Sequence, residues 1–135
     1  MILNHINLTV TDVPATQAFL QTYFGLRSTS ANRNLAVLVD DGGLILTLTS
    51  MKLGGETEVR YPANFHIGFA QGSSAQVDEI HRRLAADGYT PPLPSSQHGS
   101  WTFYFDAPGG FTIEVLGPLP DVPSPGGGRS EVSSS

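Results

Sequence analysis

Two histidines and one glutamate are the residues of this chain whose types and positions could hold a metal ion. His5 and His66 occupy the same place in two similar phrases, Asn4–Val10 and Phe65–Ala70. Glu114 interrupts an apolar run, where an unpaired carboxylate would be costly. Two imidazoles and one carboxylate can hold a divalent transition metal and leave positions open for water or substrate. Taken singly, a strand histidine is more often a hydrogen-bonded structural residue. The metal-site hypothesis therefore depends on the equivalent positions of His5 and His66 in the two phrases.

The two histidine phrases belong to a longer internal repeat. Each is followed by a helix-like run and is closed by a second phrase, Asp41–Leu48 in the first copy and Pro108–Val115 in the second. Thr47 and Glu114 take equivalent places in these closing phrases. A repeat of this length indicates two copies of one supersecondary unit. Each copy predicts a strand, a helix and two or three further strands, which is typical of the α+β class.

The first copy must hold His5 on a strand. Residues 2–10 alternate, so that Ile6 and Leu8 share an apolar face while His5 and Asn7 share the polar one. Thr11 or Asp12 can cap the helix that follows. The apolar stripe of that helix is predicted to consist of Ala15, Phe19 and Tyr23. Later strands are predicted at 35–39 and 44–49, and a weaker one at 28–30.

The second copy must hold His66 and Glu114 on two of its strands. Ser73 with Gln76 predicts a capping box at the start of its helix. Residues 90–100 are rich in proline and serine and predict an irregular loop. Residues 101–105 predict an aromatic strand, and residues 111–116 predict the last strand, with Glu114 opposite its apolar face.

Composition limits the functions that this chain can have. Its 135 residues suffice for one domain or two small units, and 39% of them are hydrophobic. The net charge is −5 and the seven Lys and Arg residues are scattered, which excludes a basic face for nucleic acid. There is no cysteine, no secretory signal and no apolar stretch of about 20 residues that could span a bilayer. We therefore expect a cytoplasmic protein that contacts neither nucleic acid nor membrane.

Changes in composition predict the boundaries of four segments. The first module is expected at 1–51 and the second at 64–117, with a polar connector at 52–63 between them. Residues 118–135 combine repeated prolines with Gly126–Gly128 and a run of serines. This composition cannot bury apolar surface, so we expect a disordered tail.

Five short phrases and one acid carry a family resemblance: Asn4–Ile6, Thr11–Val13, Phe24–Leu26, Phe65–Ile67, Phe103–Gly110 and Glu114. With them, the chain resembles the vicinal oxygen chelate superfamily over residues 2–117. That superfamily contains glyoxalase I, fosfomycin-resistance thiol transferases, extradiol dioxygenases and bleomycin-resistance proteins. The resemblance implies two βαβββ modules that form an incomplete barrel around a cup. It also implies a homodimer in which cups are shared between subunits.

The resemblance implies roles for single residues. One divalent metal (Zn, Mn, Fe, Ni or Co) is expected on His5, His66 and Glu114, with Glu114 also available as a catalytic base. The fourth ligand position of the family is Thr47, a poor ligand, so the site is expected to have three protein ligands. Asn7 and Thr47 are expected to line the cup.

Three residues of the second copy are further candidates for contact with a substrate. His98 could be a proton shuttle or an extra ligand, although a solvated loop histidine is the commoner case. Trp101 and Tyr104 could bind an aromatic ligand, although Trp101 alternates with its neighbours like an ordinary core residue.

Two functions from different classes follow. The first is a metal-dependent lyase, isomerase or oxygenase acting on a small oxygen-rich or electrophilic metabolite, with the metal as Lewis acid. The second is a metal-independent protein of the bleomycin-resistance type that sequesters an aromatic antibiotic or metabolite. A ligand-free structural dimer is the least favoured reading, because polar residues on a concave face need partners.

Overall fold

The computed structural model describes residues 1–121 and divides into two compact units. The first unit comprises Met1–Phe65 with Asp106–Thr112, and the second comprises His66–Phe105 with the described residues from Ile113 onwards. Each unit is described by itself below. Most of the predicted tail, residues 122–135, lies outside the described residues.

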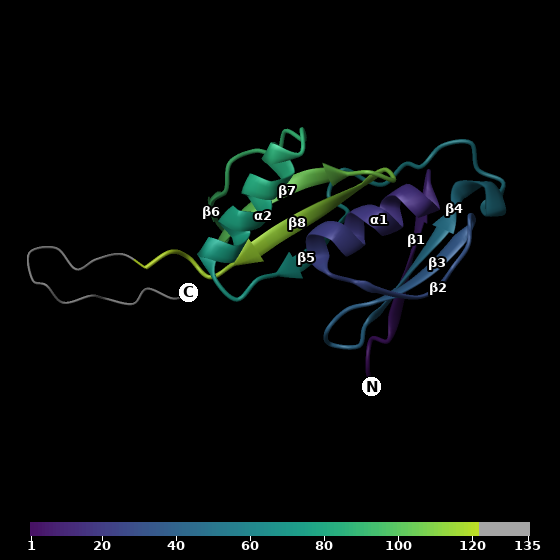
Figure 1. Cartoon of the computed structure of the whole chain (residues 1–135), viewed down its shortest axis with the longest axis horizontal. Coiled ribbons are helices and arrows are strands. Elements are labelled where there is room, and N and C mark those ends of the chain that lie inside the picture. The colour runs from purple at the N-terminus through teal and green to yellow at the C-terminus, as the bar shows by residue number, and fades with distance from the viewer. Residues whose placement is uncertain (122–135) are drawn as a thin grey trace, which may run out of the picture. The chain divides into compact units, whose positions relative to one another are not determined.

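The first module is a four-stranded sheet with one helix (Figure 1). Its strands lie in the order β1-β4-β3-β2, with β1 and β4 parallel and the other pairs antiparallel. The weakly predicted strand at 28–30 is thereby confirmed as β2. A 3₁₀ turn, η1 (Met51–Gly54), follows the sheet. The elements are β1 (His5–Val10), α1 (Val13–Phe24), β2 (Arg27–Ala31), β3 (Leu35–Val39) and β4 (Ile45–Ser50).

The second module repeats this order of elements, with its strands arranged β5-β8-β7-β6. The α+β class and the two βαβββ modules predicted from the repeat are therefore confirmed. One local prediction was wrong: residues 95–97 of the supposed irregular loop form a short strand that pairs antiparallel with β7. The elements are β5 (His66–Ala70), α2 (Ser74–Ala86), β6 (Ser95–Gln97), β7 (Ser100–Ala107) and β8 (Phe111–Gly117).

Both helices begin at the caps that the sequence predicts. Asp12 accepts a hydrogen bond from the backbone N–H of Ala15, and Ser73 accepts one from that of Gln76. The predicted stripe of α1 was wrong at Ala15, which is exposed. Thr16 is buried in its place, because its hydroxyl donates to the carbonyl of Asp12. Neither helix of residues 1–121 has the length and apolar character needed to cross a membrane.

The turn between β7 and β8 packs within the first unit. The carbonyl of Gly109 accepts a hydrogen bond of 3.1 Å from the backbone N–H of Thr11, just beyond β1. Gly109 has φ +102°, and an added Cβ would lie 2.5 Å from Oγ1 of Thr16 and 3.2 Å from Val10. Only glycine fits this position without displacing its neighbours.

Tyr61 links the chain segment after the first sheet to β1. Its hydroxyl donates to the carbonyl of Thr9 and accepts from the N–H of the same residue. Burial raises the pKa of Tyr61 above its usual value of 10.0, and the hydrogen bond with Thr9 offsets part of this rise. The folded state therefore holds this proton to a higher pH than the unfolded chain does.

We expect Tyr61→Phe to lower the free energy of unfolding by about 1 kcal/mol at pH 8, because two hydrogen bonds are lost. The contribution of Tyr61 is complete below pH 10 and falls as the pH rises through the folded-state pKa, since the unfolded chain then binds fewer protons. Urea unfolding of both proteins at pH 8 and at about pH 10.5 measures the difference. A difference that stays constant between the two pH values would contradict this role.

Candidate functional site

The candidate site of the second unit is built around the buried carboxylate of Glu114 on β8. This residue is only 5% exposed, although it lies between the core residues Ile113 and Val115. Its Oε2 atom lies 2.7 Å from the hydroxyl of Thr102 and 2.8 Å from Nε2 of His98. The burial cost of this carboxylate is therefore offset by hydrogen bonds from its own unit.

His66 on β5 faces the other oxygen of this carboxylate. Its Nε2 atom lies 3.4 Å from Oε1 of Glu114, and its side chain is 37% exposed. The imidazole ring packs edge-on against the ring of Tyr104, with 5.2 Å between the centroids. Two predicted metal ligands, His66 and Glu114, are thus adjacent in one unit.

Tyr104 on β7 adds a hydroxyl group to the same place. The hydroxyl lies 3.3 Å from Nε2 of His98. Loss of contact with water raises the pKa of Tyr104, and the nearby Glu114 carboxylate raises it further. Tyr104 therefore keeps its proton at neutral pH and can donate a hydrogen bond.

We refer to these five side chains as the Glu114 cluster: His66, His98, Thr102, Tyr104 and Glu114. Imidazole nitrogens and a carboxylate are ligands for a transition metal, and the same groups can also accept and deliver protons. The Glu114 cluster therefore contains groups that could bind a metal or transfer protons, which the pairing of apolar strands does not require.

Three other predicted site residues, His5, Asn7 and Thr47, lie together in the first unit. The parallel pairing of β1 with β4 sets Asn7 beside Thr47. Asn7 also accepts a hydrogen bond from the hydroxyl of Thr49. His5 is exposed, and its Nδ1 atom lies 3.1 Å from the side-chain oxygen of Asn4. These residues form a polar sheet face.

The predicted metal set of His5, His66 and Glu114 spans both units and stays a prediction. Within residues 1–121, no three side chains of His, Cys, Asp or Glu are grouped so that they could hold a metal ion. Trp101 does not join the Glu114 cluster, because its indole N–H donates to Asp78 of α2 at 2.8 Å. The helix α2 packs against β7, where the ring of His81 contacts that of Phe103.

Thr102 is the one member of the cluster that the sequence reasoning missed. Alternation along β7 places Thr102 and Tyr104 on one face and the buried Phe103 and Phe105 on the other. A polar residue that interrupts an aromatic strand could have indicated the neighbour of Glu114.

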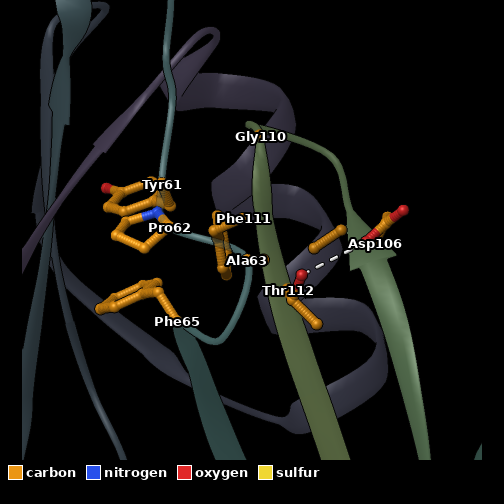
Figure 2. A pocket seen from close by; sticks show the side chains of 9 residues that line it. Tyr61, Pro62, Ala63, Phe65, Asp106, Gly110, Phe111 and Thr112 are labelled. Carbon is orange, nitrogen blue, oxygen red and sulfur yellow. Dashed lines mark hydrogen bonds between the residues drawn. The ribbon is translucent and has the colours of Figure 1, made fainter.

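The first unit contains an open cavity of about 450 Å³ (Figure 2). Tyr61 and Phe65 stack in one wall, with 4.5 Å between their ring centroids and 13° between their planes. At another edge the hydroxyl of Thr112 donates to Asp106. None of the predicted site residues lines this cavity. Its lining residues are Tyr61, Pro62, Ala63, Phe65, Asp106, Ala107, Gly110, Phe111 and Thr112.

Residues 2–115 match the sequence model of the glyoxalase/bleomycin resistance protein/dioxygenase superfamily. The chain is 47% identical to a possible glyoxalase from Bacillus cereus, with a TM-score of 0.77, over 86% of this chain and 98% of that one. The fosfomycin resistance protein FosX from Listeria monocytogenes is similar in fold, at 24% identity and a TM-score of 0.71, over 88% and 96%. A lactoylglutathione lyase from Agrobacterium tumefaciens is also similar in fold, at 22% identity and a TM-score of 0.68, over 86% and 92%. No match was found among curated proteins.

Proposed function

Because the chain belongs to the glyoxalase/bleomycin resistance protein/dioxygenase superfamily, we propose that it is a metal-dependent enzyme that acts on a small oxygen-rich or electrophilic metabolite. The reaction would be of the lyase, isomerase or oxygenase type. The observation that carries this proposal is the buried carboxylate of Glu114 beside the half-exposed imidazole of His66. Proteins that are similar to this chain in fold include a lyase and a fosfomycin resistance protein.

Two donor atoms of the second unit, Nε2 of His66 and Oε1 of Glu114, have a spacing that supports the proposal of a divalent metal. Two neighbouring ligands that each lie about 2.1 Å from one metal are roughly 3 Å apart. The separation of 3.4 Å between Nε2 of His66 and Oε1 of Glu114 is close to that value. In this proposal His5 completes the set, and the ion is Zn, Mn, Fe, Ni or Co, all of which accept imidazole and carboxylate.

Residues of the Glu114 cluster would then have different roles in the reaction. A bound metal supplies Lewis-acid polarisation of substrate oxygens, which contributes several kcal/mol to the stabilisation of developing charge. Tyr104 holds its proton at neutral pH and can donate a hydrogen bond to a substrate oxygen. Oε1 of Glu114 would accept a proton only when it does not hold the metal, while Oε2 stays hydrogen-bonded to Thr102. Asn7 and Thr47 would orient the substrate from the first unit.

We expect His66→Ala to weaken metal binding about 100-fold or more, since one of two adjacent donors is lost. Chelator-treated protein without a tag is titrated by calorimetry with Mn²⁺, Fe²⁺, Co²⁺, Ni²⁺ and Zn²⁺. His81→Gln is the matched control, because His81 contacts the carbonyl of Pro91 and the ring of Phe103 instead of the Glu114 cluster. Equal affinities for the wild type and His66→Ala would contradict the assignment.

We further propose a homodimer in which His5 of one subunit serves the same site as His66 and Glu114 of the other. A mixture of His5→Ala and His66→Ala chains tests this arrangement. A heterodimer with shared sites contains one intact site, so metal binding returns on mixing. If each site used one chain alone, every site would lack a ligand and mixing would restore nothing.

The second candidate function is metal-independent sequestration of an aromatic antibiotic or metabolite. The observation that favours it is the cavity of Figure 2, whose volume of about 450 Å³ and stacked aromatic wall suit a flat ligand. Calorimetric titration of planar antibiotics into metal-free protein tests it, with Phe65→Ala beside the wild type. Binding that Phe65→Ala abolishes would favour sequestration, and no binding by the wild type would exclude it.

A further inference from the structure

His98 occupies a backbone position that is uncommon for residues other than glycine. Gln97 pairs with Ser100, so that β6 and β7 are joined by a loop of only two residues, His98 and Gly99. Both loop residues have positive φ, at 41° and 81°, as in a type I′ turn. Among the described residues 1–121, His98 is the only residue other than glycine with positive φ.

Histidine is tolerated at positive φ, but it is not the residue that this turn type prefers. Asn-Gly and Asp-Gly are the preferred pairs in a type I′ turn, because the short side chains of Asn and Asp tolerate the left-handed region. A residue in a sparsely populated region has a conformational cost, and such costs gather at functional sites. The contacts of the imidazole show what histidine adds at this position.

The side chain of His98 reaches the carboxylate of Glu114. Its Nε2 atom lies 2.8 Å from Oε2, the same oxygen that lies 2.7 Å from the hydroxyl of Thr102. In the metal-binding state proposed above the carboxylate is ionised and only accepts hydrogen bonds, so Nε2 of His98 would be the donor of this pair. The contacts of Oε2 with His98 and Thr102 limit the rotation of the carboxylate, and Oε1 lies 3.4 Å from Nε2 of His66.

We propose that His98 is a positioning residue that fixes the carboxylate of Glu114 for metal binding. This inference rests on the proposed function and assigns His98 a role other than substrate contact. Partners that hold a ligating carboxylate typically change metal affinity about 10- to 100-fold when they are removed. The β6–β7 turn holds the imidazole beside the carboxylate of Glu114, because a loop of two residues has little conformational freedom.

The substitution His98→Asn separates this role from a structural one. Asparagine suits the turn better than histidine, and Thr102 still serves Oε2, so the midpoint of thermal unfolding should stay equal or rise. The imidazole is lost, so metal affinity should fall about 10- to 100-fold. A structural role predicts the opposite pair of results, namely a lower midpoint and an unchanged affinity.

Calorimetric titration and thermal unfolding of the wild type, His98→Asn and the control His81→Gln form the test. Unchanged metal affinity in His98→Asn, with a metal-binding wild type, would overturn the inference and leave the proposed function standing. A wild type that binds no metal would sink the proposed function instead. Crystal structures of both metal-free proteins then decide: a rotated Glu114 carboxylate in His98→Asn supports the positioning role, and an unmoved one overturns it.

Discussion

Replacing Glu114 with glutamine should lower metal affinity more than about 100-fold, which corresponds to roughly 2.7 kcal/mol. Glutamine has nearly the same shape as glutamate but carries no negative charge, so it is a weak ligand for a divalent ion. Its oxygen can still accept hydrogen bonds from Thr102 and His98 in the place of Oε2. The amide group then faces His66, where the carboxylate lies 3.4 Å from Nε2 in the wild type.

The measurement for Glu114→Gln is a competition titration against a chelator of known affinity, together with thermal unfolding. Because the hydrogen bonds to Oε2 are kept, we expect the protein to remain folded. Thr102→Ser serves as the matched control, because it keeps the hydroxyl beside Oε2 and removes only a methyl group. A folded Glu114→Gln protein with wild-type affinity would remove Glu114 from the ligand set.

Replacing Gly109 with alanine should lower the free energy of unfolding by roughly 3 kcal/mol or more. Two costs combine in this turn. Alanine is strained at φ +102°, and its Cβ would lie 2.5 Å from Oγ1 of Thr16. Thr16 cannot move away easily, because it is fully buried and donates to the carbonyl of Asp12. The hydrogen bond from Thr11 to Gly109 would be disturbed as well.

Gly43→Ala is the control that separates these two costs. Gly43 also has a positive φ, +90°, but nothing lies within 4 Å of the position of an added Cβ. We expect a loss of only about 1 kcal/mol there, from backbone strain alone. Chemical unfolding of both variants measures the difference. Equal losses would show that the close contact between the added Cβ at position 109 and Thr16 does not lower the free energy of unfolding.

Much of the fold could be predicted from the sequence because local rules and the repeat agree. Alternation places Leu8 and Val10 in the core and His5 on the opposite face, and the structure has the same pattern. The caps at Asp12 and Ser73 follow from side-chain chemistry that acts within one helical turn. The same order of strand, helix and further strands in the second copy then supports the assignment made for the first.

The parts that escaped prediction depend on tertiary contacts. Strand β6 is short and fully exposed, so no apolar periodicity marks it, and only its pairing with β7 defines it. Ala15 and Thr16 are neighbours on α1, and the choice between them depends on what packs beside the helix. Apolar spacing favoured Ala15, whereas the structure buries the hydroxyl of Thr16.

The candidate site could be predicted in part for the same reasons. His66 and Glu114 follow from equivalent places in the repeat and lie on neighbouring strands. His98 was a candidate from its residue type, but its contact with Glu114 depends on a two-residue turn inside a segment that reads as a loop. The substrate contact expected of Trp101 stays a prediction, and its indole N–H donates to Asp78 of α2. Residue type alone did not indicate which face of β7 it occupies.

Native mass spectrometry of the wild-type protein, purified without a tag or a chelator, tests the central claim most directly. The expected result is one divalent metal ion per chain, retained through gel filtration and lost from His66→Ala and Glu114→Gln. The contradicting result is a metal-free chain that also takes up none of Mn²⁺, Fe²⁺, Co²⁺, Ni²⁺ and Zn²⁺ on incubation. That result would leave sequestration in the cavity of the first unit as the function to pursue.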